Sequence, residues 1–249
     1  MSSIATSTQT SIRMFGAWCG PGYMIALLLG WWLCAGFLPA TPPLTTPDEV
    51  RGIFEANLTG IRVGMVIVMW AALIFIFFAG ALAHYVSRIE GGPGVLTYAI
   101  VLGGAGNMVL TFYPAVWWLV AAYRPERAPE LIALFNDMAW LQFIGGVSMY
   151  DALPIALAVA IFCDKSPNPV FPRWAGFANA AVVFMILPDQ LLFFFHSGPF
   201  AWNGLFGLWI PLVVFGGWFL LMFLLLRRAI LRDRQEGVPL AAGVRYSAA

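Results

Sequence analysis

Charged side chains are scarce in this sequence. Of its 249 residues, 10% are Asp, Glu, Lys or Arg, whereas 61% are hydrophobic. Soluble domains carry about 25% charged residues, so this composition excludes a water-soluble globule and indicates a protein that uses the bilayer as its solvent. The net charge is +1, and no basic patch lies outside the flanks of apolar segments. Nothing therefore indicates a nucleic-acid partner.

Metal-binding and redox residues are equally few. The three cysteines, Cys19, Cys34 and Cys163, are scattered and form no CxxC motif, so we interpret them as small packing residues. The only histidines, His84 and His196, are predicted near opposite membrane faces, which excludes a two-histidine metal site or bis-histidine haem within one chain. No cofactor is indicated.

Enzyme signatures are also missing. The sequence has no GxSxG, HExxH or P-loop motif, and no lysine lies within an apolar segment to carry retinal. A stand-alone enzyme is therefore disfavoured. The enzymatic form that best suits the sequence would use Asp137 or Asp189 as acid or base, or as an oxygen ligand of a metal shared with a partner chain.

Long apolar runs dominate what is present. A hydrocarbon core of about 30 Å needs roughly 20 residues of helix, and six segments qualify, the first interpreted as a retained span rather than a signal peptide. Because open strand edges cannot be satisfied in lipid, we predict an all-α bundle of six transmembrane helices in a single membrane domain over 1–249. The spans are 15–38, 61–85, 94–123, 131–163, 174–196 and 203–228, and a short disordered tail is expected over 235–249.

The longest predicted connection, 39–60, begins with four prolines in nine residues, which favours an extended entry. The following PDEVRGIFEANL could form a short amphipathic helix, because Asp48 and Glu49 would lie at its N-terminus, where the helix dipole favours acids. Such a helix would lie on the membrane surface as a partial lid. A plain surface loop is the alternative.

The distribution of Arg and Lys predicts the orientation, because cytoplasmic loops are enriched in these residues. With the N-terminus in the cytoplasm, nine cations fall on that side, and only Arg51, Arg62, Arg124 and Arg127 fall on the other. The nine are Arg13, Arg88, Lys165, Arg173, Arg227, Arg228, Arg232, Arg234 and Arg245. We therefore expect a bacterial inner-membrane protein with both termini in the cytoplasm.

Three aspartates are the main anomaly. Asp137, Asp151 and Asp189 lie inside predicted spans, where an ionised Asp costs roughly 2.5–3.5 kcal/mol at the helix centre. Asp137 and Asp151 are fourteen residues apart, close to four helical turns, and would share one helix face. Intramembrane acids without a cationic partner mark functional sites by default.

Estimated depths divide the polar residues into two stations. The outer station would hold Asp189, Asp137, Asn136, Asn107, His196 and Asn203, and the inner one Asp151 and His84. A structural alternative exists, because Asn136 and Asp137 lie near a helix start, where they could cap it, and Asp151 and Asp189 lie near backbone groups freed by proline.

Helix-breaking and aromatic residues suggest where a ligand would sit. Five prolines fall inside the spans, namely Pro21, Pro114, Pro154, Pro188 and Pro211, as in transporters with broken helices, although a static bundle with a cavity would show the same pattern. Aromatic residues near Asp189 could form a pocket for an apolar or aromatic small molecule. The candidates are Phe194, Phe195, Phe200 and Trp202.

Two functions fit these patterns. The preferred hypothesis is a proton- or cation-coupled transporter or permease for a small solute, apolar or aromatic in character. The alternative is a non-catalytic subunit of a larger membrane complex that holds a partner, a lipid or a cofactor. Expected partners are the lipid bilayer, other membrane subunits or further copies of the chain, and a small-molecule ligand.

Overall fold

The computed structural model describes residues 2–236, with side chains from residue 8 onward. Six helical segments in this range are long and apolar enough to cross a membrane, which confirms the predicted all-α membrane bundle. They are Thr8–Cys34, Leu58–Glu90, Val95–Tyr123, Pro129–Cys163, Arg173–Phe194 and Leu205–Glu236. Of the tail expected over 235–249, residues 237–249 lie outside the described residues, and residues 235 and 236 belong to the last helix.

Several spans consist of more than one helix. The N-terminal span joins α1 (Ser2–Leu28) to the π-helix η1 (Leu29–Cys34), and α2 (Pro47–Ala56) precedes the two uninterrupted spans α3 (Leu58–Glu90) and α4 (Val95–Tyr123). The fourth span comprises α5 (Pro129–Gly145) and α6 (Ser148–Cys163). The fifth joins α7 (Arg173–Ile186) to the 3₁₀-helix η2 (Leu187–Phe194), and the sixth joins the π-helix η3 (Leu205–Trp209) to α8 (Ile210–Glu236).

Helix α3 packs against α1 and α4. Helix α4 also contacts α5 and α6, and α7 packs against both α6 and α8. The core at α3 is aromatic: Phe78 stacks on Phe219 of α8 with ring centroids 5.5 Å apart, and Phe75 lies against Tyr23 of α1 at 5.2 Å. Interlocking rings of this kind supply close packing where lipid gives no hydrophobic drive between helices.

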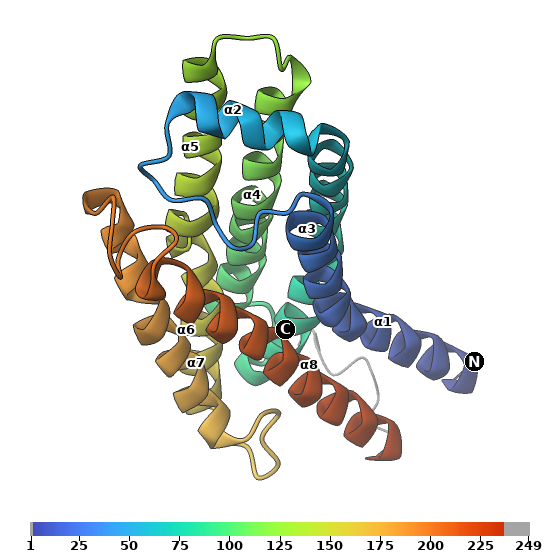
Figure 1. Ribbon diagram of the computed structural model, residues 1–249. Coiled ribbons are helices and arrows are strands. Elements are labelled where there is room, and N and C mark those ends of the chain that lie inside the picture. Colours follow the sequence, from blue (N-terminus) through green and yellow to red (C-terminus); the bar gives the residue numbers. More distant parts are fainter. Residues whose placement is uncertain (1, 237–249) are drawn as a thin grey trace.

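Short helix α2 lies across one end of the bundle, as Figure 1 shows. A capping box begins it: the Thr46 hydroxyl accepts from the Glu49 amide, and the Glu49 carboxylate accepts from the Thr46 amide. The Thr46 hydroxyl and amide both donate to the Glu49 carboxylate, and these two hydrogen bonds hold the pKa of Glu49 below its usual value. The predicted amphipathic helix is confirmed, and its apolar face buries Val50 and Phe54.

The opposite end of the bundle brings together the beginning of α1, the end of α3 and the end of α8 (Figure 1). The 164–172 loop at this end is ordered by Asp164, which accepts hydrogen bonds from the Ser166 amide and hydroxyl and from the Val170 amide. Burial raises the pKa of Asp164, but these hydrogen bonds outweigh it and hold the pKa below its usual value.

Candidate functional site

Asp189 is the most deeply buried acid of the bundle. It lies on η2, directly after α7 changes to 3₁₀ geometry at Leu187, and its side chain is completely buried. Oδ1 accepts a hydrogen bond from Gln190 Nε2 at 3.0 Å, and the same nitrogen donates to the Gly145 carbonyl at 2.7 Å. Oδ2 has no hydrogen-bond partner among the described residues. One carboxylate oxygen is therefore available for a proton, an ion or a ligand.

Asp151 belongs to the same buried region. It lies in the first turn of α6, after the chain breaks at Gly146 and Val147, and 8% of it is exposed. Its Oδ1 is buried without a partner, and its charge interacts electrostatically with Asp189. Within residues 8–236, no Arg or Lys forms an ion pair with either acid, and no main-chain amide donates to them. The structural alternative of backbone capping thus does not describe this pair.

A chain of hydroxyl and amide groups from α1 and α4 lies on the other side of this region. Tyr23 Oη and Thr111 Oγ1 are 2.8 Å apart, Thr111 donates to the Asn107 carbonyl, and Asn107 Nδ2 donates to Tyr23. Tyr150, adjacent to Asp151, interacts electrostatically with both Asp151 and Tyr23, and its buried hydroxyl has no partner among the described side chains. Polar groups of α1 and α4 are hydrogen-bonded to each other, Tyr150 of α6 lies within electrostatic range of Tyr23, and Asp151 lies within that of Asp189 on η2.

A cavity of about 70 Å³ opens beside Asp189. Its polar lining comes from Asp189, Tyr23 and Thr111, and the rest of its wall is almost entirely aliphatic or aromatic, including Trp31 and Phe143. A cavity needs about 10–15 Å³ to hold one water molecule, so this one has room for several waters or for one end of a small ligand. An apolar pocket with a few polar groups is a typical arrangement for small-molecule binding.

Helix interruptions surround the cavity. The π-helix η1 begins at Leu29, the α5–α6 break follows Gly145, η2 contains Asp189, and the π-helix η3 ends at Trp209. Residues of all four segments, or their immediate neighbours, line the cavity. Pi-bulges and broken helices recur at functional sites, because they free backbone groups and allow local rearrangement.

The two-station arrangement, which rests on estimated depth, stays a prediction, but two observations bear on it. Asp151, assigned to the inner station, interacts with Asp189, assigned to the outer one. The α5–α6 break at Gly146 and Val147 also interrupts the continuous helix on which the shared face of Asp137 and Asp151 was based, so that premise was wrong. Asp137 is half-buried beside Asn136 on α5, and its electrostatic interactions do not include Asp189.

The remaining outer candidates are dispersed. Asn107 belongs to the Tyr23–Thr111 chain, while Asn136 accepts a hydrogen bond from Trp118 Nε1 at 3.3 Å. His196 is exposed and Asn203 is half-buried, and neither lines the cavity.

The proposed aromatic pocket is rearranged as well. Phe194 and Phe195 are exposed on the surface of the molecule, and Phe200 stacks on Phe206. Trp202 alone of the four joins a buried aromatic cluster, in which it stacks on Trp140 and donates to the Thr41 carbonyl at 2.6 Å. That cluster comprises Trp31, Phe37, Trp118, Trp140, Phe143 and Trp202. Because Tyr23, Trp31, Phe143 and Phe215 line the cavity, the aromatic wall of the site comes from α1, η1, α5 and α8 instead of from 194–200.

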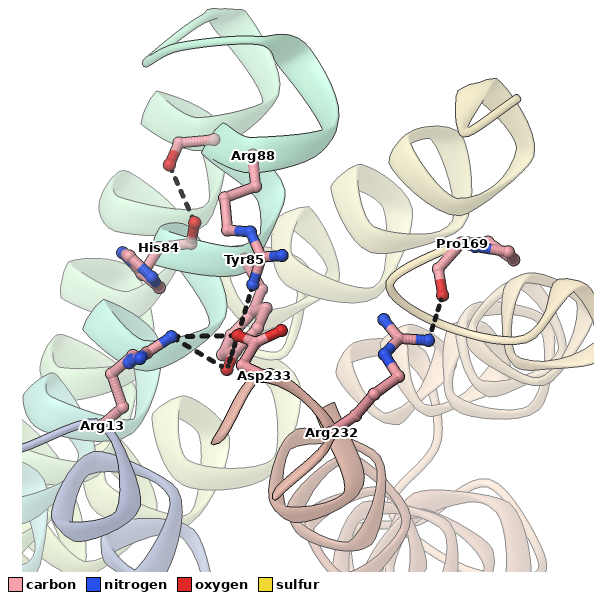
Figure 2. Close-up of polar contacts among 8 residues, drawn as sticks. Arg13, His84, Tyr85, Arg88, Pro169, Arg232 and Asp233 are labelled. Atoms are coloured by element: carbon pink, nitrogen blue, oxygen red, sulfur yellow. Dashed lines mark hydrogen bonds and ion pairs between the residues drawn. The ribbon is translucent and has the colours of Figure 1, made fainter. Parts of the chain in front are cut away.

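His84 does not line the cavity and lies instead beside an ionic cluster that the sequence did not reveal (Figure 2). Asp233 Oδ2 accepts from Arg13 Nη1 at 3.0 Å, from Arg88 Nη1 at 2.5 Å and from Tyr85 Oη at 3.0 Å. His84 is adjacent to Tyr85 and interacts with the charges of this cluster. Asp233 lies between Arg232 and Arg234 in a charged run, so the sequence resembles an exposed helix end and carries no signal of burial.

Between residues 8 and 236, no group of three or more His, Cys, Asp or Glu side chains is arranged to hold a metal. The chain matches no known protein family, and no curated protein or solved structure matches it. The residues themselves must therefore support any functional assignment.

Proposed function

We propose that this multi-pass membrane protein is a permease for a small, mainly apolar solute, and that protons or a cation carried by Asp151 and Asp189 drive its movement. In this proposal it acts in a bacterial inner membrane with both termini in the cytoplasm. The solute binds beside Asp189, with its apolar part against Trp31 and Phe143. The acids alternate between neutral and ionised states as the site opens to either side.

One observation carries this proposal: Asp189 is fully buried, faces a cavity and keeps one oxygen unpartnered, with a second acid within electrostatic range. Leaving a buried acceptor unsatisfied costs about 1–3 kcal/mol, and more when it is charged. Two neighbouring acids without a cation repel each other when both are ionised. Such an arrangement is unfavourable for a scaffold and useful for a site that exchanges protons or cations.

Broken helices supply the movement that a permease needs. Asp189 and Asp151 each lie at a change of helix geometry, so small rearrangements of η2 or of the α5–α6 break would alter their exposure. In secondary transporters, the half-helices at such breaks bind substrate and coupling ions near the membrane midplane. Among the described spans, only α3 and α4 cross as single uninterrupted α-helices.

Flux through liposomes tests the proposal, with radiolabelled indole and benzoate as neutral and anionic aromatic probes. We expect at least one probe to cross the membrane of liposomes that contain the protein faster than that of protein-free liposomes, in a pH-dependent manner. Asp189→Asn and Asp151→Asn should return this flux to the protein-free level. Asp137→Asn is the matched control, because Asp137 is only half-buried and lies outside the acid pair, so it should have the smaller effect.

Two outcomes would contradict the coupling. Flux and pH dependence that are unchanged in all three asparagine variants would mean that the acids carry no proton or cation. A flux lost equally in Asp137→Asn and Asp189→Asn would show that the acid pair has no special role.

The complex-subunit hypothesis keeps one supporting observation. Helix α7 and η2 expose Phe177, Phe184 and Phe194, each at least 64% accessible, on a span with little buried surface. In a complex these rings would pack on another membrane subunit. Extraction in mild detergent, followed by measurement of the mass of the extracted particle, distinguishes the two hypotheses. A mass that corresponds to a lone chain or a homo-oligomer would argue against the complex-subunit hypothesis.

A further inference from the structure

A second cavity, of about 180 Å³, lies at the opposite end of the bundle from α2, between the 164–172 loop and the last turns of α8. Arg228 and Arg232, one helical turn apart, contribute its charge, and Asn168 contributes an amide. Leu225, Ala229 and Val170 form its apolar part. This cavity shares no residue with the one beside Asp189.

The two arginines have unused binding capacity. Arg232 Nη1 donates to the Pro169 carbonyl at 2.9 Å (Figure 2), and this is its one hydrogen bond with the described chain. Arg228 is exposed and forms no hydrogen bond or ion pair with any residue between 8 and 236. The nearby Asp164 interacts electrostatically with Arg232, and its oxygens already accept hydrogen bonds from Ser166 and Val170. Two guanidinium groups against one acid leave a net positive cavity.

The position of the arginines along α8 indicates the depth of this cavity in the membrane. Arg227 and Arg228 directly follow FLLL, at the end of the last apolar run, so the charged rim lies where the hydrocarbon meets the headgroups. Consecutive residues of α8 face different neighbours here: Asp233 points to α1 and α3, whereas Arg232 points to the loop (Figure 2). The ionic cluster thus anchors α8 and leaves Arg232 directed toward the cavity.

We infer that this cavity binds the phosphate headgroup of an anionic phospholipid. Guanidinium groups suit phosphate oxygens, which they bind in bidentate fashion. The apolar part of the cavity would contact the glycerol and the first acyl carbons, a contact that a free phosphate ion cannot make. Basic pockets between transmembrane helices on the cytoplasmic side bind anionic headgroups in the same way.

Native mass spectrometry of the full-length chain in mild detergent tests the assignment, with phosphatidylglycerol and phosphatidylcholine as the probes. We expect phosphatidylglycerol to be retained and phosphatidylcholine not. Each arginine near the membrane surface contributes about a fivefold change in affinity, so Arg228→Gln should weaken phosphatidylglycerol binding about fivefold, and R228Q/R232Q more. Because Arg228 forms no hydrogen bond or ion pair with any other described residue, the single variant keeps the test valid if the double variant folds poorly.

The double variant R227Q/R234Q is the matched control, because both arginines are exposed on the same helix and neither lines the cavity. It removes equal charge and should keep phosphatidylglycerol bound. The assignment is overturned if this control loses the lipid as fully as R228Q/R232Q, or if phosphatidylcholine binds equally well. It is also overturned if inorganic phosphate raises the melting temperature as much as phosphatidylglycerol does, since the ligand would then be the free ion.

Discussion

Asp233 and Asp189 are both buried aspartates, and their surroundings give them different roles. Asp233 receives three hydrogen bonds, two of them from arginines on α1 and α3. Asp189 receives one, from its neutral neighbour Gln190. A carboxylate satisfied by cations suits a permanent structural contact, whereas one with a free oxygen beside a cavity suits reversible binding.

The structural role of Asp233 can be measured. Removing one partner of a buried ion pair leaves uncompensated charge and costs about 3–5 kcal/mol, so Asp233→Ala should lower the melting temperature of the protein in detergent. Since Arg88 is partly exposed, we expect the lower part of that range. Arg234→Ala, an exposed neighbour, is the control and should change stability little. Equal melting temperatures for Asp233→Ala and wild type would refute the structural role.

At the scale of the elements, a close backbone contact joins η1, the π-helical end of the first span, to α3. A side-chain methyl group placed on Gly30 of η1 would meet the Gly64 carbonyl of α3, and one placed on Gly64 would meet the Gly30 carbonyl. Small residues allow helices to approach this closely in membranes. This contact therefore holds the π-helix η1 against α3. The same end of the first span also lines the cavity.

Gly64→Ala should disturb this contact. Overpacking typically costs about 1–3 kcal/mol, so we expect a lower melting temperature and faster amide hydrogen exchange in η1. Gly80→Ala, on the same helix, is the matched control, because a methyl group there meets nothing within 4 Å. If Gly64→Ala behaves like Gly80→Ala, the contact does not hold η1 in place.

At the scale of the whole molecule, an even number of spans places the beginning of α1 and the end of α8 at the same end of the bundle. There the two helices meet at the Asp233 cluster. The exposed Cys163 at the end of α6 provides a probe of which side this end faces. The proposed orientation places it in the cytoplasm, on the side that carries most of the arginines.

A membrane-impermeant maleimide tests the orientation in a Cys19→Ser/Cys34→Ser background. We expect Cys163 to react in inside-out vesicles and to be protected in intact cells. With Cys163 also replaced by serine, a cysteine introduced as Glu126→Cys in the 124–128 turn should react only in intact cells. The reverse pattern would invert the orientation.

Regular features were predictable from local sequence. The six spans and α2 follow from apolar length, proline placement and the acids at the α2 N-terminus, and the structure confirms them. Which candidate residues lie together was harder to predict, because their depths in the membrane were estimated as if every span were a straight, continuous helix. The α5–α6 break and the 3₁₀ geometry of η2 change both the rise and the direction of the side chains, so Asp151 and Asp189 come into range while His84 joins Asp233.

Composition and the lengths of the apolar runs already indicated a helical bundle in a membrane, because lipid leaves backbone groups no partner except within a helix. They also identified Asp151 and Asp189 as anomalous, since burying an acid in an apolar segment is costly wherever it points. Only the tertiary structure decided which acids meet a cation, which meet each other and which face a cavity. Those relations depend on helix rotation and on interruptions, and both are set by packing between segments far apart in the chain.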